Sequence, residues 1–146
     1  MRKKYYRLNS VFHFVADLLS KFSLFLLVPL IIVAIYWDHT NEGVRTILAF
    51  VISAAISFFI GLLFKLIFNK NKIDGSASML ICGLSWIFIS AVGALPYVFI
   101  IKAPYLNAYF EAVSGFTTTG ITVFSGLDSM ARSLIFWRSF TQWIGG

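Results

Sequence analysis

Cysteine, histidine and charge are all scarce in this sequence. The only cysteine is Cys82, so no intrachain disulfide can form, and with two histidines the metal-site spacings that need several Cys or His are absent. Charged residues make up 12% of the chain, against about 25% in ordinary soluble domains. A Ser/His/acid set, a glycine-rich phosphate loop and a carboxylate pair in a polar setting are also missing, so we expect neither an enzyme nor a covalent cofactor.

Long hydrophobic runs take the place of that missing charge. Hydrophobic residues make up 59% of the chain, and three charge-poor stretches, at residues 10–37, 46–64 and 76–101, predict membrane-crossing helices. A helix over residues 10–37 would be about 42 Å long at 1.5 Å per residue. Because the hydrocarbon core is about 30 Å thick, this helix must tilt or kink, and Pro29 is the natural kink. No small-residue cleavage site follows, which favours a retained span over a signal peptide.

Two patterns within these spans predict helix contacts. Asp17 and Lys21 are four residues apart and can pair on one helix face. Ser53, Ser57 and Gly61 recur every four residues and form a small-residue face that lets another helix approach closely. We interpret both patterns as packing features.

The net charge of +6 is distributed unevenly along the chain. With a cytoplasmic N-terminus, one side of the membrane holds eight basic and two acidic residues, net +6, and the other side is neutral. This asymmetry predicts that the N-terminus is cytoplasmic and the loop at 102–130 is external. Basic residues flank apolar runs instead of forming a patch with interleaved aromatics, so we expect lipid and no nucleic acid as a partner. The inner residues are Arg2, Lys3, Lys4, Arg7, Asp17, Lys21, Lys65, Lys70, Lys72 and Asp74; the outer ones are Asp38, Glu42, Arg45, Lys102, Glu111, Asp128, Arg132 and Arg138.

The external loop is too apolar to be an ordinary loop. Residues 105–116 predict a short amphipathic helix, too short to span, that enters the membrane and returns. Asn107 is the expected N-cap, preceded by Pro104, and Glu111 is expected near the positive end of the helix dipole. Backbone that is not helical at membrane depth must be enclosed in protein or line a water-filled cavity.

The residues that follow this short helix predict a cation-binding strand. We expect an extended run over 117–122, in which the backbone of Thr117, Thr118, Thr119, Gly120 and Ile121 binds an ion, with K+ held chiefly at Thr118, Thr119 and Gly120. The negative C-terminal end of the short helix favours a cation there, and Gly120 permits a positive φ. The threonine hydroxyls either coordinate the ion or hold the strand from behind.

Three nearby polar residues are candidates for supporting this strand. They are Glu111, Ser114 and Thr122. Glu111 either braces the strand or tunes its electric field, and the sequence does not decide between these roles.

Two motifs in order resemble a known family. They are FEAVSGFTTTG at residues 110–120, followed by GLDS at 126–129, and FWRSFTQWIGG at 136–146. This pattern resembles the first pore repeat of the Trk/Ktr/HKT potassium transporters and is closest to the bacterial TrkH type. The potassium-channel string Thr-Val-Gly-Tyr-Gly is absent.

The resemblance implies four unequal helix–pore loop–helix repeats in one chain around a single potassium path. By position, Gly120 matches the filter glycine and Thr117, Thr118 and Thr119 the residues before it. It implies an N-terminal segment with a two-helix hairpin at 1–72 and the first repeat at 73–146. It also implies K+ as the transported ion, a homodimer of the whole protein, a cytoplasmic nucleotide-binding regulatory subunit and a multi-pass location in the bacterial inner membrane.

The sequence stops at Gly146, where the second helix of that repeat should be about halfway across the membrane. We therefore expect the N-terminal portion of a potassium transporter, with the first half of a fourth span, that does not conduct alone. Two alternatives are a self-assembling helix–pore loop–helix channel subunit and a membrane adaptor that transports nothing.

The remaining polar and aromatic residues favour structural roles. His13 and His39 have no partner at metal-ligand spacing and are expected at interface or solvent positions. Arg138 is costly in a membrane unless paired or wet, and Asp128 or Glu111 is its expected partner. Membrane-interface or packing positions suit the tryptophans Trp37, Trp137 and Trp143.

Overall fold

Within the residues that the structure describes, every regular element is a helix. This computed structural model describes residues 2–37, 43–71 and 73–146, with side chains from Leu8 onward. Three stretches are long and apolar enough to cross a membrane, namely Leu8–Ile35, Val44–Ile67 and Gly75–Ile101. The predicted all-α membrane fold is confirmed. Its elements are α1 (Arg2–Phe25), α2 (Leu30–Ile35), α3 (Val44–Ile67), α4 (Gly75–Gly93), α5 (Leu95–Ile101), α6 (Tyr105–Phe116), the 3-10 turn η1 (Leu127–Ser129) and α7 (Arg132–Gly145).

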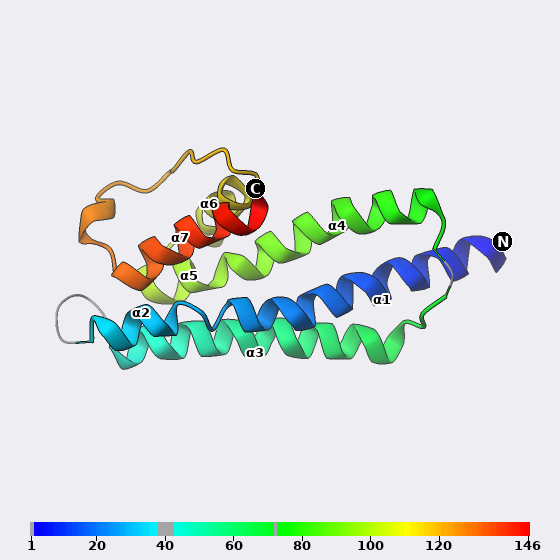
Figure 1. Cartoon of the computed structure of the whole chain (residues 1–146), viewed down its shortest axis with the longest axis horizontal. Coiled ribbons are helices and arrows are strands. Elements are labelled where there is room, and N and C mark those ends of the chain that lie inside the picture. The colour runs from blue at the N-terminus through cyan, green and yellow to red at the C-terminus, as the bar shows by residue number, and fades with distance from the viewer. Residues whose placement is uncertain (1, 38–42, 72) are drawn as a thin grey trace.

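The spans lie lengthwise beside one another (Figure 1), and α1 contacts both α3 and α4. The start of α1, the end of α3 and the start of α4 lie at one end of the molecule, and the starts of α3 and α7 lie at the other. The chain therefore alternates direction as three crossings require. Lys72, Asp38 and Glu42, used in the charge count, lie outside the described residues.

The first span breaks where Pro29 was expected to kink it. Helix α1 ends at Phe25, a turn follows, and α2 starts at Leu30 directly after Pro29. The amides of Leu27 and Val28 donate to carbonyls three residues back, those of Leu24 and Phe25, at 3.1 and 3.2 Å. Proline has no amide hydrogen and its ring crowds the preceding turn, so the predicted kink is confirmed.

The predicted small-residue face of α3 lies against α1. Ser57 Oγ donates to the Leu19 carbonyl at 2.8 Å. A Cβ at Gly61 would lie 2.7 Å from the Ala16 carbonyl oxygen and 2.8 Å from the Ser20 nitrogen. Only glycine permits this approach of the two backbones, which confirms the packing interpretation.

The predicted Asp17–Lys21 pair forms, and a second lysine joins it. Asp17 Oδ2 lies 2.7 Å from Lys21 Nζ, and Asp17 Oδ1 lies 2.6 Å from Lys65 Nζ on α3. One carboxylate thus links α1 to the far end of α3.

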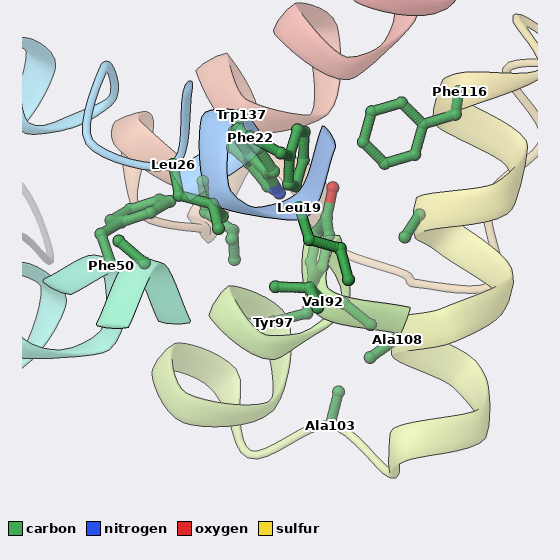
Figure 2. Packing of buried hydrophobic residues seen from close by; sticks show 14 of the residues in the cluster. Leu19, Phe22, Leu26, Phe50, Val92, Tyr97, Ala103, Ala108, Phe116 and Trp137 are labelled. Atoms are coloured by element: carbon green, nitrogen blue, oxygen red, sulfur yellow. The ribbon is translucent and has the colours of Figure 1, made fainter. Parts of the chain in front are cut away.

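The core is centred on Trp137, which is fully buried with Phe22 and Phe50 around it (Figure 2). Its Nε1 donates to the Gly93 carbonyl at 3.0 Å. Gly93 ends α4, at the break before Pro96. Of the two positions expected for this tryptophan, interface or packing, the structure shows packing.

Helix α6 has the expected bounds, Tyr105–Phe116, but not the expected N-cap. Its N-cap residue is Pro104, and Ala108 N donates to the Pro104 carbonyl at 3.1 Å. The expectation that Asn107 caps the helix is wrong, because Pro104 takes the extended conformation (φ −53°, ψ 136°) that directs the chain into the helix at Tyr105. Glu111 consequently lies near the middle of this 12-residue helix and not at its positive end.

Candidate cation-binding loop

The loop expected to bind a cation joins α6 to η1 at the surface of the described chain. Thr117, Thr118, Thr119, Gly120 and Ile121 are all exposed. The residues before them on α6, including Ser114, Gly115 and Phe116, are buried. The loop backbone is therefore exposed, and the helix end that holds it is buried.

The first residues of the loop form a turn and not an extended strand. Thr117 has φ −86° and ψ 4°, and Thr118 has φ 57°. Gly120 has φ 73°, so the expected positive φ occurs, but Thr118 shares it. The expectation of an extended run from Thr117 is wrong for these first residues, because the chain wraps around the end of α6.

The amides of the turn all donate to carbonyls in the last turns of α6. Thr117 N reaches Val113 O at 2.9 Å and Thr118 N reaches Gly115 O at 2.9 Å. The amides of Thr119 and Gly120 share Ser114 O at 3.0 and 3.3 Å. These bonds satisfy carbonyls that a helix end leaves without partners.

The carbonyls of the loop fall into two groups. Within the described part of the chain, the carbonyls of Thr117, Thr118 and Thr119 accept no hydrogen bond. In contrast, Gly120 O accepts from Arg138 Nη2 at 2.7 Å, and Ile121 O accepts from Ser114 Oγ at 2.6 Å. Three consecutive carbonyls are thus left available to a ligand.

The hydroxyls of Thr117 and Thr119 make contacts with each other and with α6. Thr117 Oγ1 donates to Val113 O at 2.8 Å and lies 2.9 Å from Thr119 Oγ1. These bonds match the expectation of hydroxyls that hold the loop from behind, and the ion-binding roles of the loop residues remain predictions.

Glu111 is the centre of the polar network behind the loop. Its side chain is fully buried. Oε1 accepts from Arg138 Nε at 2.6 Å, and Oε2 accepts from Thr122 Oγ1 at 2.9 Å and Val123 N at 3.3 Å. A buried carboxylate is stable only when it is paired and hydrogen-bonded in this way. It joins α6, the loop and α7.

The position of Arg138 depends on close contact between α6 and α7. A Cβ at Gly115 would collide with the Thr141 hydroxyl, and one at Gly145 would collide with the Phe116 carbonyl. Thr141 Oγ1 itself donates to Arg138 O at 2.7 Å. Small residues at these points bring the arginine within reach of the loop. Gly115 and Gly145 are the sequence signal for this contact, but their places on two separate helices do not reveal it.

The other residues singled out in the sequence make the following contacts. Arg138 pairs with Glu111, the second of its two expected partners. Arg132 lies over the ring of Tyr36, 4.9 Å from its centroid. His13 Nδ1 donates to Phe68 O at 2.8 Å, a link between α1 and the end of α3. Trp37 and Trp143 are exposed, and His39 lies outside the described residues.

Comparison with known proteins gives consistent matches. Residues 45–146 match the TrkH family profile, described as cation transport protein. An uncharacterized cation transporter of Methanocaldococcus jannaschii is 31% identical over 140 residues, which are 95% of this chain and 28% of that protein. The potassium uptake protein TrkH of Escherichia coli K12 is 41% identical over 81 residues, which are 53% of this chain and 17% of that protein.

A solved structure matches the fold as well. The crystal structure of the potassium transporter TrkH from Vibrio parahaemolyticus aligns with a TM-score of 0.82 at 28% identity, over 94% of this chain and 29% of that one. The chain therefore spans less than a third of the length of these relatives.

Proposed function

The chain belongs to the TrkH family of cation transport proteins, and from this we propose that it forms the N-terminal part of a potassium transporter of the cytoplasmic membrane. The loop at 117–120 would line one side of the ion path. The names of the relatives in Escherichia coli and Vibrio parahaemolyticus, potassium uptake protein and potassium transporter, support K+ as the ion.

The observation that carries this proposal is the set of free carbonyls at Thr117, Thr118 and Thr119. Their amides are turned toward α6, so their oxygens are the groups left to face a ligand. Carbonyl oxygens can replace the hydration shell of K+. The C-terminal end of α6 adds about half a negative charge next to them, which favours a cation over an anion.

One loop supplies ligands from one side only, and a dehydrated K+ needs oxygens around it. We propose that the other ligands come from further pore loops and that the 146-residue polypeptide alone does not conduct. Proteoliposomes containing only this polypeptide should show no selective, saturable K+ uptake. Such uptake, together with a stable cross-linked homotetramer, would support a self-assembling channel instead.

The proposal also covers the orientation of the chain in the membrane, its protein partners and its lack of enzymatic activity. The excess of basic residues at one end supports a cytoplasmic N-terminus, with the loop entering from outside. By resemblance to the family we propose a homodimer, a cytoplasmic nucleotide-binding regulatory subunit and no enzymatic activity.

The direct test is Gly120→Asp in the complete transporter that carries this chain. We expect loss of K+-dependent growth, because the side chain strains a backbone at φ 73° and adds a charge beside the free carbonyls. Gly126→Asp is the matched control, since Gly126 lies in the same connection with φ 71°. Unchanged K+ uptake in Gly120→Asp would indicate the membrane adaptor instead.

A further inference from the structure

A guanidinium group lies behind the loop that we assign to the ion path. We propose that Arg138 is a positioning residue, which holds the Gly120 carbonyl away from the path so that the oxygens of Thr117, Thr118 and Thr119 form the ligand set. This inference rests on the proposed function and changes which residues bind the ion.

The arginine makes two directed contacts at once. Its Nη2 donates to Gly120 O at 2.7 Å, and its Nε donates to Glu111 Oε1 at 2.6 Å. Both are charge-assisted hydrogen bonds, which are shorter and stronger than neutral ones. The planar guanidinium fixes the angle between them, and a lysine ammonium cannot reproduce this fork. The carbonyl of Gly120 is therefore held in one direction.

A cation does not fit on the same oxygen. Gly120 O already binds a positive group, and a second cation there would lie in direct repulsion with it. Ile121 O is occupied by the Ser114 hydroxyl at 2.6 Å. The oxygens available to K+ therefore begin at Thr119 and continue toward the end of α6. In this arrangement Gly120 is required for its backbone angle, φ 73°, and not as a ligand.

Glu111 neutralises the positive charge of Arg138, which would otherwise repel a cation in the proposed path. The carboxylate is fully buried while the Arg138 side chain is 20% exposed, and their 2.6 Å contact forms a neutral pair. Removing either partner leaves an uncompensated charge near the loop. We expect Glu111→Gln to weaken K+ binding through the remaining positive charge. Replacing both residues by glutamine removes both charges and should recover part of that loss.

The test is made in the complete transporter, by measuring K+ uptake kinetics and competition by Na+ for Arg138→Lys, Glu111→Gln and the Glu111→Gln/Arg138→Gln pair. For Arg138→Lys we expect the preference for K+ over Na+ to fall about tenfold, the effect of losing one charge-assisted hydrogen bond. Arg132→Lys is the matched control on the same helix, since Arg132 lies over Tyr36, and its preference should not change.

The kinetics separate a positioning role from a merely structural one. A structural role predicts a lower maximal rate with unchanged selectivity and KM, and that result would overturn the proposal. A KM for the double variant no better than that of Glu111→Gln would overturn the electrostatic part. The amount of folded protein is compared by size-exclusion chromatography for every variant.

A second measurement needs no variant. Crystals of the complete transporter soaked in Tl+, which substitutes for K+ and scatters strongly, should show density in contact with the carbonyls of Thr117, Thr118 or Thr119. Density bonded to Gly120 O would overturn the inference while supporting the proposed function. A wild-type transporter that neither takes up K+ nor binds Tl+ at the loop would contradict the proposed function itself.

Discussion

Two residues of the loop have left-handed backbone angles. Gly120 adopts φ 73° without strain, whereas Thr118 adopts φ 57° despite its branched Cβ. A non-glycine residue in this region costs about 1–3 kcal/mol. The Thr118 amide is bonded to Gly115 O at 2.9 Å, so the end of α6 holds a conformation that threonine would not choose. The backbone conformation of the loop is therefore set by the end of α6.

Gly120→Ala in the complete transporter should weaken K+ uptake at limiting K+ about tenfold, since a left-handed angle costs an alanine about 1–2 kcal/mol. Crowding is not the cause, because a Cβ at Gly120 meets nothing within 4 Å. Gly83→Ala is the matched control: its Cβ also meets nothing within 4 Å, but Gly83 lies inside α4. Equal losses in both variants would contradict this explanation.

At the scale of the element, one buried side chain attaches α7 to the core. Trp137 is fully buried, and its bond to Gly93 O attaches α7 to the broken third span. Arg138 follows directly in sequence. The Trp137 contact therefore fixes the position of the Arg138 guanidinium relative to the loop.

Trp137→Phe should lower the free energy of unfolding by about 2–4 kcal/mol, because it leaves the Gly93 carbonyl unpaired and a void beside it. Trp143→Phe, on the same helix but 76% exposed, should change it by less than about 0.5 kcal/mol. Thermal unfolding of the purified proteins in detergent measures both. Similar shifts for the two variants would show that the Trp137 contact is not specific.

The contact of α1 with α3 gives a second prediction for an element. Gly61→Val should destabilise the protein by about 2 kcal/mol or more, since its side chain must push α1 away at Ala16 and Ser20. Gly83→Val places the same side chain in open space and serves as the control. An unchanged unfolding temperature for Gly61→Val would mean that the two helices separate at little cost.

At the scale of the whole molecule, the proposed topology places the two ends of the helical bundle on opposite sides of the membrane. Residues of the α3–α4 connection lie at the end where α1 starts, and the segment before α7 lies at the other. The proposed topology makes the first end cytoplasmic.

Cysteine labelling tests this orientation in a Cys82→Ser background, since Cys82 is the native cysteine and is exposed. A membrane-impermeant maleimide should label Asp128→Cys in intact cells, because Asp128 is an exposed residue before α7. Asn69→Cys, an exposed residue after α3, should be labelled only after the membrane is opened. The reverse pattern would invert the topology.

The sequence predicted what depends on neighbours along the chain. The spans, the break at Pro29 and the small face of α3 follow from local composition and spacing, and the structure confirms them. The contact of Arg138 with Glu111 and Gly120 spans 27 and 18 residues, and it depends on how closely α7 approaches α6. From the sequence, Glu111 and Asp128 were both expected as partners of Arg138. The carbonyl direction at Gly120 could not be derived, because it is set by packing between helices.

In the ion path that we propose, the hydrogen bonds from the loop amides to α6 would also affect how fast ions pass. Ordering the backbone of a residue costs about 1–2 kcal/mol. In residues 117–120 the amides are bonded to carbonyls of the helix as part of the fold. The ordering entropy is thus lost once, when the protein folds, and not again each time an ion arrives, so successive ions can occupy and leave the loop without rebuilding it.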